Sequence, residues 1–248
     1  KYVEANERAK EDEAFAAAGY ELLAKMAEGD PETQQQFYAI TSKCLEGQLA
    51  VLGRLGIEYD EFDRESAFLK DPRLDQVVEA LQEKDAIFTD DDKRLVVDLA
   101  KLGHDRDEGR YFVLMRANGS SMYGYRDIAY TIDKMESGAA ANLWVLGEDH
   151  KLYAEQQRMI LEAAGKPAPE TIYYAYILLK EGKMSTRQGN VVLLSDFIDE
   201  AISRAAEKVE AQCADLPPEE RRAIAERVAV AAVRFAILRV GLTKNVLF

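Results

Sequence analysis

The sequence predicts an α/β protein, and three observations support this fold class. A short apolar segment at 142–150 ("NLWVLGEDH"), expected to form a short buried strand that runs into a loop, precedes an amphipathic helix pattern at 151–165. A second apolar segment follows at 171–179. Strand, loop, helix and strand in this order are typical of a βαβ unit in a parallel sheet. Helical periodicity also dominates residues 1–56 and the chain from residue 196 onward.

The first 56 residues are predicted to be helical, with a break at 28–33 ("EGDPET"). In this break Asp30 is the expected N-cap and Pro31 the first residue of the next helix. Apolar residues then recur at helical spacing and two glycines mark the end: Phe37, Ile40, Cys44, Leu45, Leu49, Leu52 and Leu55, with Gly53 and Gly56.

After the helical start, the middle of the chain is predicted to contain both strands and helices. The expected elements are a helix at 72–84, strands at 94–100 and 110–116, a helix at 126–135 and the βαβ unit, whose helix Gly165 ends. The segment 224–240 ("IAERVAVAAVRFAILRV") is apolar almost all round, which predicts a buried helix. We place the domain boundary near residue 120. Residues 1–119 would form a helical and hairpin module, and 120–248 a Rossmann-like half.

Composition limits the possible functions. The 248 residues are 48% hydrophobic, and no apolar run approaches the roughly 20 residues that span a bilayer. Cys44 and Cys213 lie far apart, which argues against a disulfide framework or a zinc site and favours a reducing, cytoplasmic compartment. No basic-then-apolar leader opens the chain, so nothing indicates secretion. The net charge of −13 does not favour long-range attraction of nucleic acid, although local basic patches can still bind polyanions.

The segment 177–190 ("ILLKEGKMSTRQGN") concentrates cations, hydroxyls and glycines in an acidic chain. Gly182 and Lys183 suggest a phosphate loop, but the Walker pattern also needs a glycine at 177 and a hydroxyl at 184. These positions hold Ile177 and Met184, so the Walker interpretation fails. A solvated basic turn between two strands remains the simple structural alternative.

The remaining pattern, Lys-Met-Ser followed by Gly189 and Asn190, resembles the second catalytic motif of the class I aminoacyl-tRNA synthetases. The resemblance implies a loop that closes over ATP and stabilises the charge on departing pyrophosphate. The implied catalytic residues are Lys183, Met184, Ser185, Thr186 and Arg187, and the implied ATP contacts include Lys183 and Ser185. Thr186 stands where the commonest motif has a second lysine, so Arg187 takes over part of that role.

Two further segments indicate the amino-acid specificity. Residues 120–136 ("SSMYGYRDIAYTIDKME") and 145–157 ("VLGEDHKLYAEQQ") resemble ordered segments of arginyl-tRNA synthetases, and "KMSTRQGN" is similar to the form in their archaeal-type branch. The segments before residue 120 resemble the connective insertion and hairpin of that family. The fold implied is the second half of a class I Rossmann-like nucleotide-binding domain with a helical and β-hairpin connective insertion.

By this resemblance Tyr123 would contact the substrate arginine, Asp127 would pair with its guanidinium, and Asp149 would line the same pocket. His150 would meet ATP or arginine. The chemistry agrees, because a guanidinium stays protonated and its forked donors suit carboxylates. A structural alternative remains for Asp127, as a helix N-terminal residue favoured by the dipole.

Three further residues receive no assigned role. Glu148 is expected to be a solvated loop residue, and His104 an exposed turn residue. Tyr125 stands where the family usually has threonine, which leaves the local packing open.

The first class I motif, His-x-Gly-His, does not occur, since His104 and His150 are the two histidines of the sequence. Together with a start at Lys1 rather than Met, this leads us to expect a piece of a longer, monomeric arginine–tRNA ligase. Its substrates would be L-arginine, tRNA(Arg) and ATP with Mg²⁺, without a tightly bound cofactor or a resident metal. The piece alone is expected to be inactive, and half a Rossmann sheet would leave an exposed strand edge.

Two alternatives stay open. In the first alternative, the chain is a free-standing synthetase-like paralogue that binds arginine, a nucleotide or a protein partner without ligation. The Lys183-Met184-Ser185 loop argues against this, because a pure binder needs no pyrophosphate-stabilising loop. A different class I specificity is the other alternative, against which the Tyr-Arg-Asp segment counts.

Overall fold

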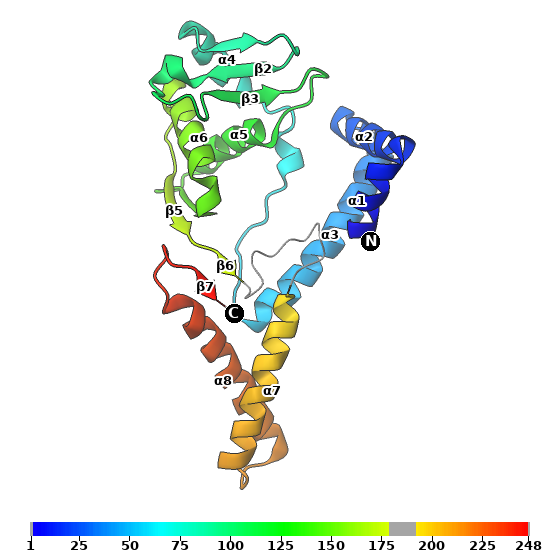
Figure 1. Cartoon of the computed structure of the whole chain (residues 1–248), viewed down its shortest axis with the longest axis vertical. Coiled ribbons are helices and arrows are strands. Elements are labelled where there is room, and N and C mark those ends of the chain that lie inside the picture. The colour runs from blue at the N-terminus through cyan, green and yellow to red at the C-terminus, as the bar shows by residue number, and fades with distance from the viewer. Residues whose placement is uncertain (1, 179–191, 248) are drawn as a thin grey trace. The chain divides into compact units, whose positions relative to one another are not determined.

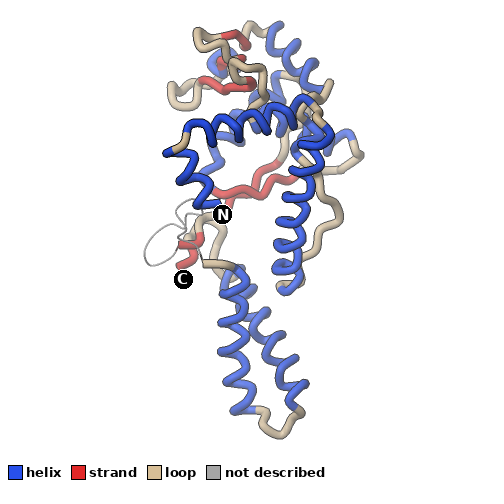
Figure 2. The backbone as a smooth tube through the Cα atoms, turned by 90° about the vertical axis from the view of Figure 1, so that its right-hand side faces the viewer, coloured by secondary structure: helices blue, strands red, loops and turns tan. Residues whose placement is uncertain are grey.

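The structure is a computed structural model that describes residues 2–178 and 192–247. The chain forms two compact units, and each is described by itself (Figures 1 and 2). One unit comprises residues 61–175, and the other combines residues 1–60 with 176–248. This division rests on contacts within the folded chain, so the family-based boundary at residues 119 and 120 stays a prediction.

The unit at 61–175 contains three helices, two sheets and short 3-10 turns among its described elements. In chain order they are η1 (Glu65–Phe68), α4 (Arg73–Glu83), β1 (Ile87–Thr89), β2 (Leu95–Asp98), η2 (Leu99–Leu102), β3 (Tyr111–Met115), α5 (Tyr123–Glu136), β4 (Leu143–Gly147), η3 (Glu148–His150), α6 (Lys151–Ala163) and β5 (Glu170–Tyr174). The predicted helix at 72–84 and the strands at 94–100 and 110–116 are confirmed. The helix predicted at 126–135 begins three residues earlier, at Tyr123.

The predicted βαβ unit is confirmed, but its second strand is shorter than the apolar segment at 171–179. It ends at Tyr174, and Ile177–Leu178 pair instead with Val246–Leu247 in a separate sheet. Strands β4 and β5 are parallel, with Leu143 opposite Glu170 and Gly147 opposite Tyr174. Helix α6 connects them and ends at Ala163, and Gly165, two residues further on, has a φ of +67°. The backbone N–H of Lys166 donates to the carbonyl oxygen of Leu161 across this turn, the bond that closes such a helix end.

The core of this unit lies where α4, α5 and α6 pack against the antiparallel sheet β1–β2–β3 (Figure 1). Its buried side chains come from the three helices, from β2 and β3 and from the turns η1 and η2: Phe68, Leu74, Val77, Leu81, Val97, Leu99, Phe112, Leu114, Tyr125, Ile128, Ile132, Ile160 and Leu161. The inward stripes of α5 and α6 are therefore fixed by apolar packing, and this positions the polar residues that lie on the same helices.

Two corrections concern this unit. His104 is buried, not an exposed turn residue, and its ring Nε2–H donates to the carbonyl oxygen of Glu108 at 2.8 Å. This bond holds the His104 ring against the unit, and the polar sequence around it does not indicate that the ring is buried. Strand β4 is not fully buried, because Leu143 and Val145 are 52% and 63% exposed. This alternation with half-buried Trp144 is that of a sheet covered on one face.

The other unit is mainly helical. Its described elements are α1 (Tyr2–Glu11), α2 (Glu13–Glu28), α3 (Pro31–Arg54), β6 (Ile177–Leu178), α7 (Leu194–Gln212), α8 (Pro218–Leu238) and β7 (Val246–Leu247). Helix α3 begins as predicted, since the Asp30 carboxylate accepts the backbone N–H of Thr33 at 2.8 Å and Pro31 is the first helical residue. Near its other end, the Arg234 guanidinium donates to the carbonyl oxygen of Leu55 at 2.8 Å.

Helix α8 was predicted to be buried, and this is wrong for the described part of the chain. Its buried residues are Ala225, Ala229 and Val233, which form one stripe at four-residue spacing. Val228 and Phe235 are 49% and 67% exposed. Ala225 and Ala229 of this stripe pack against α7. Because the described residues cover only this face of α8, apolar residues on its other faces remain accessible to solvent.

Candidate functional site

The candidate site is formed where the first turns of α5 and α6 approach each other. Tyr123 is the first residue of α5, and Asp127 lies four residues later on the same helix face. Asp127 therefore belongs to the second turn and does not open the helix. Since the helix dipole acts within the first turn, it does not account for a carboxylate at this position.

A chain of hydrogen bonds joins the two helices. The hydroxyl of Tyr153 on α6 donates to Oδ2 of Asp127. Nε2 of Gln157 donates to the Tyr153 oxygen at 3.1 Å and to the carbonyl oxygen of Gly124 at 2.6 Å. Gln157 is completely buried. The position of the Asp127 carboxylate is thus defined by two side chains one helical turn apart on α6.

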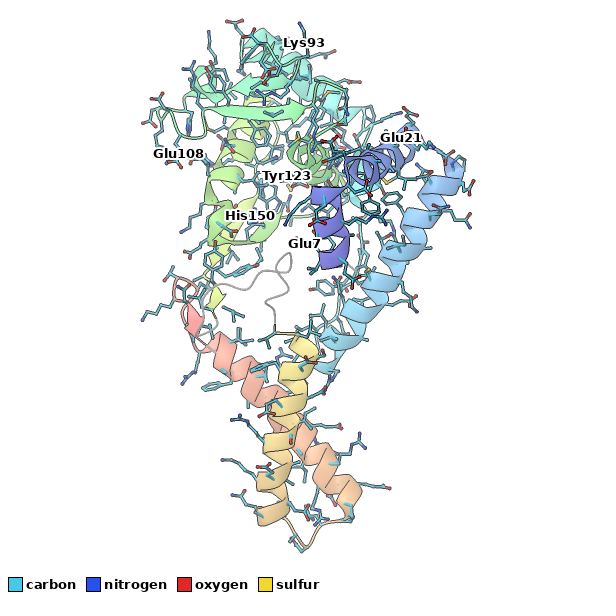
Figure 3. All side chains as sticks on the ribbon, turned by 45° about the vertical axis from the view of Figure 1, so that its right-hand side comes forward. Glu7, Glu21, Lys93, Glu108, Tyr123 and His150 are labelled. Atoms are coloured by element: carbon cyan, nitrogen blue, oxygen red, sulfur yellow. The ribbon has the colours of Figure 1, made fainter. Side chains whose placement is uncertain are left out.

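Aromatic rings surround this chain. The rings of Tyr123 and Tyr153 are stacked, with centroids 5.1 Å apart. Phe112 and His150 each lie 6.1 Å from the same Tyr153 ring, the histidine edge-on. Tyr123 is 50% exposed, so one part of the aromatic cluster faces solvent while the other belongs to the core. Figure 3 marks Tyr123 on α5 and His150 at the start of α6.

Gly124 allows the two helices to come this close. A Cβ atom at this position would lie 2.5 Å from Cζ of Phe112 and 3.1 Å from Nε2 of Gln157. Real Cβ atoms do not approach ring carbons so closely, so a side chain would force the elements apart. The glycine also leaves its carbonyl oxygen accessible to Gln157.

The electrostatics follow from partial burial. Desolvation raises the pKa of the Asp127 carboxyl, and the donor from Tyr153 opposes this shift. Burial and the neighbouring Asp127 also raise the pKa of the Tyr153 phenol, so this hydroxyl keeps its proton and donates at neutral pH. A cation that pairs with a partly desolvated carboxylate interacts with it more strongly than in water.

The other predicted site residues differ in their placement. His150 is exposed and lies beside Tyr153. Asp149 is also exposed, in the turn η3. Glu148 is half-buried, and its carboxylate lies 3.9 Å from Nζ of Lys151.

The predicted catalytic loop cannot be described. Lys183, Met184, Ser185, Thr186 and Arg187 lie outside the described residues. Their proposed roles stay predictions.

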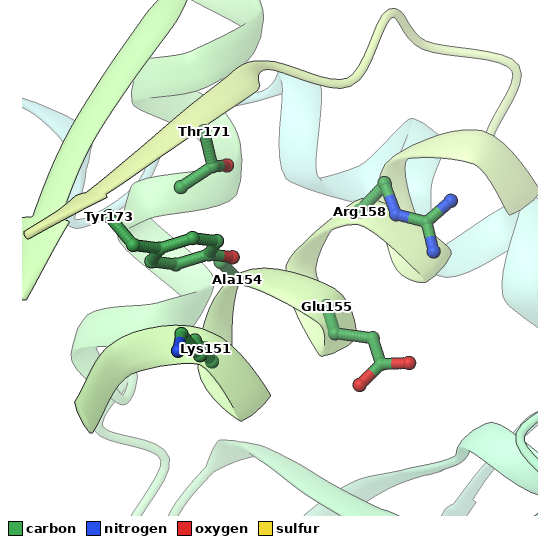
Figure 4. Close-up of a pocket in the computed structure, with 6 residues that line it drawn as sticks. All are labelled: Lys151, Ala154, Glu155, Arg158, Thr171 and Tyr173. Carbon is green, nitrogen blue, oxygen red and sulfur yellow. The ribbon is translucent and has the colours of Figure 1, made fainter. Parts of the chain in front are cut away.

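A hollow lies between α6 and β5 (Figure 4). It is lined by Lys151, Ala154, Glu155, Arg158, Thr171 and Tyr173. Its charged groups already have partners, since Glu155 pairs with Arg106 at 2.5 Å and Arg158 with Glu162 at 3.1 Å. Within residues 2–178 and 192–247, no group of three or more histidine, cysteine, aspartate or glutamate side chains is placed to hold a metal ion.

Sequence reasoning missed Tyr153, Gln157 and Gly124. A signal for two of them exists, because Tyr153 and Gln157 stand four residues apart in an amphipathic helix pattern. Gln157 lies on the apolar face with Ile160 and Leu161, where an amide needs a buried partner. The sequence does not reveal that this partner lies on α5.

Comparison with known proteins identifies the class of protein to which this site belongs. The profile of the family described as "tRNA synthetases class I (R), catalytic domain" matches residues 1–248, so the chain belongs to this family. The arginine–tRNA ligase of Methanocella arvoryzae is 40% identical over 248 residues, and that of Methanothermobacter thermautotrophicus is 36% identical over 247.

A solved structure agrees on the fold. The arginyl-tRNA synthetase of Thermus thermophilus, 22% identical, superposes with a TM-score of 0.67 over 94% of this chain and 47% of its own. This confirms the predicted class I fold. The chain spans 43% of the Methanocella arvoryzae protein and 42% of the Methanothermobacter thermautotrophicus protein. In the part that the structure describes, no helix is both long and apolar enough to cross a membrane.

Proposed function

We propose that this chain is part of an arginine–tRNA ligase that activates L-arginine with ATP and transfers it to the 3′ end of tRNA(Arg). One observation carries the proposal: a half-buried carboxylate, Asp127, is held by Tyr153 beside a half-exposed tyrosine ring. The family membership and the relatives named as arginine–tRNA ligases support the same conclusion.

In this proposal Asp127 recognises the guanidinium of the substrate. Guanidinium is always charged and offers donors in a rigid fork that a carboxylate accepts. The ring of Tyr123 stands one turn before Asp127 and offers a flat face for a planar cation. Asp149 would add a second negative charge from the turn η3. Lysine has a point charge in place of the fork, so the site favours arginine over lysine.

The same proposal assigns the ATP contacts to His150 and to residues of the Lys-Met-Ser loop. His150, at the junction of η3 and α6, contacts ATP, and Lys183 and Ser185 reach its phosphates from the Lys-Met-Ser loop. Arg187 assists there, with Met184 and Thr186 completing the loop. Mg²⁺ arrives with ATP as part of the substrate and needs no resident site. The chemical contribution of the loop is to neutralise charge that develops on pyrophosphate.

The full-length ligase would act as a monomer in the cytoplasm. The isolated chain would not activate arginine, because it has no His-x-Gly-His motif for the ATP phosphates. Pyrophosphate exchange with ATP, arginine and tRNA tests this directly. Exchange by the isolated chain above the level of a blank would contradict the expected inactivity.

The test of the main proposal uses the full-length protein. It should attach arginine to tRNA(Arg), and citrulline, a neutral analogue of similar shape, should fail because it does not pair with Asp127. Asp127→Asn should raise the KM for arginine at least about a hundredfold, as expected for loss of a desolvated charge pair. Asp63→Asn is the matched control. Like Asp127, Asp63 accepts a hydrogen bond from a tyrosine hydroxyl, here that of Tyr130 at 2.9 Å, but Asp63 is exposed.

The alternative function is a paralogue that binds arginine, nucleotide or a partner protein without ligation. It predicts arginine binding that depends on Asp127 but no charging of tRNA by the full-length protein. Charging with another amino acid in place of arginine would instead favour a different class I specificity.

A further inference from the structure

The buried amide of Gln157 is the strongest feature that the proposed function leaves unexplained. Its side chain is completely buried, and its nitrogen has two partners on two different residues. Its Oε1 has no partner among the described residues. An amide that is fully buried with only one of its polar atoms paired carries a cost, so the arrangement calls for a reason.

The orientation of the amide is unambiguous. The carbonyl oxygen of Gly124 can only accept a hydrogen bond, so the group 2.6 Å away from it must be the Gln157 nitrogen. The same nitrogen lies 3.1 Å from the Tyr153 oxygen and donates to it. The Tyr153 proton is then free to point in one direction only, towards Oδ2 of Asp127. The chain therefore runs from Gln157 through Tyr153 to Asp127.

We propose that Tyr153, oriented by Gln157, is a positioning residue for arginine recognition that holds the Asp127 carboxylate in place for the guanidinium. This inference rests on the proposed function and deepens it. Tyr153 does not itself contact the substrate in this proposal. Its hydroxyl occupies one carboxylate oxygen, and the other oxygen is left for the arginine.

The charges around Asp127 decide the direction of the expected pH effect. The titratable and charged groups that act on it are Tyr153 of α6, Glu65 of η1 and Arg126 and Lys134 of α5. Tyr130 of α5 also lies nearby, and there the influence runs from Asp127 to the phenol, whose pKa it helps to raise. The Tyr153 bond lowers the pKa of Asp127 against the raising effect of burial. Removing this bond raises the pKa further. Arginine binding needs the ionised carboxylate and is lost as pH falls through that pKa, so the loss moves to higher pH.

The decisive variant is Tyr153→Phe, which removes the hydroxyl and keeps the ring that stacks on Tyr123. In the full-length ligase we expect the KM for arginine to rise about tenfold at neutral pH with kcat within about twofold. The acidic limb of the arginine kcat/KM profile should move upward by roughly half to one pH unit. A purely structural role would not produce this shift.

Tyr130→Phe is the matched control. Its hydroxyl donates to Asp63 at 2.9 Å and its ring packs 5.2 Å from Phe68, so the same chemical change is made on α5 without touching Asp127. It should leave the profile unchanged. In the Asp127→Asn background, Tyr153→Phe should add less than about a twofold further loss, because residues that act as one unit are not additive.

This double-mutant cycle of Tyr153→Phe and Asp127→Asn can contradict the inference. A full additional loss in the Asp127→Asn background, or an unshifted pH profile in Tyr153→Phe, would overturn the positioning role. If Tyr153→Phe does not fold, Gln157→Met serves as the second variant. It keeps the volume and removes the donor to Tyr153, and it should shift the profile in the same direction by a smaller amount.

The inference and the proposed function can fail separately. A wild-type ligase that does not charge tRNA with arginine would refute the proposed function. The Asp127 carboxyl pKa, measured by NMR with 13C-labelled aspartate in the same protein, then still tests the hydrogen-bond chain. Tyr153→Phe should raise this pKa and Tyr130→Phe should not. An unchanged value would refute the inference independently of activity.

Discussion

The Cζ atom of Phe112 lies 2.5 Å from the place that a Cβ atom would take on Gly124. Phe112 belongs to the core of its unit and is 8% exposed, so its ring cannot simply move into solvent. The contact couples a strand of the hairpin sheet to the first turn of α5, and through that turn to the candidate site.

Gly124→Ala should therefore destabilise the protein by about 1–3 kcal/mol, the usual cost of overpacking a core. It should also weaken the bond between Gln157 and the Gly124 carbonyl oxygen. Chemical denaturation measures the first effect. Gly47→Ala is the control, because nothing lies within 4 Å of its Cβ position inside α3. There alanine should raise stability by up to about 1 kcal/mol, and an equal loss at both glycines would contradict the packing argument.

Substitutions at Tyr123 should separate the ring from its hydroxyl. Tyr123→Phe keeps the ring stacked on Tyr153 at 5.1 Å, and we expect less than a threefold change in the KM for arginine. Tyr123→Ala removes the flat face and should raise this KM roughly tenfold, the scale of a cation–π contact. Steady-state kinetics of the full-length ligase provides the measurement. Equal effects of the two substitutions would show that the hydroxyl carries the interaction.

The pair of Asp98 and Arg110 should make stability depend on acid pH. Nε and Nη2 of Arg110 donate to the two Asp98 oxygens at 2.8 and 2.7 Å, which lowers the pKa of this carboxyl below its usual range. A carboxyl with a lowered folded pKa stabilises the fold above its unfolded value of about 3.9. That contribution is lost as pH falls through the lowered pKa.

Asp98→Asn should accordingly lower the melting temperature at neutral pH and reduce the acid dependence between about pH 5 and 2. Asp85→Asn is the control, because its carboxylate is 91% exposed and lies 3.1 Å from Lys101. The control should leave the acid dependence unchanged. A wild-type acid dependence in Asp98→Asn would mean that other carboxyls dominate the transition.

The open face of β4 should promote association of the isolated chain. Leu143 and Val145 point outward there, and the described strands pair β4 with β5 alone. Val145→Lys should lower self-association in sedimentation velocity, because a charge on an exposed strand opposes pairing with other copies. Phe88→Lys places the same charge on the hairpin sheet, where Phe88 is 40% exposed, and should have a smaller effect. Equal decreases in self-association for Val145→Lys and Phe88→Lys would show that net charge, not the position on β4, is the cause.

Local patterns predicted much of the fold. The parallel pair β4 and β5 follows from two apolar segments around an amphipathic helix, and the start of α3 follows from Asp30 and Pro31. These features depend on residues close together in sequence. The resemblance to arginyl-tRNA synthetases also named Tyr123 and Asp127, which the structure brings together on one face of α5.

Features that depend on distant partners were not predicted. Periodicity places Gln157 on the inner face of α6, but its partner Gly124 lies 33 residues away. The same limit explains His104, whose burial depends on how its turn folds onto the unit. For α8, an apolar composition does not specify which layers cover the helix. Only one stripe is covered among the described residues.

The candidate site also has a consequence for folding kinetics. The two hydrogen bonds that join its helices connect residues 26 and 33 positions apart, all between Gly124 and Gln157. Contacts over such separations close small loops, which costs less entropy and takes less time than pairing remote segments. We expect the candidate site to form early and independently of the segments at 1–60 and 176–248. The carboxylate that is proposed to recognise arginine would then be in place before the rest of the chain has finished folding.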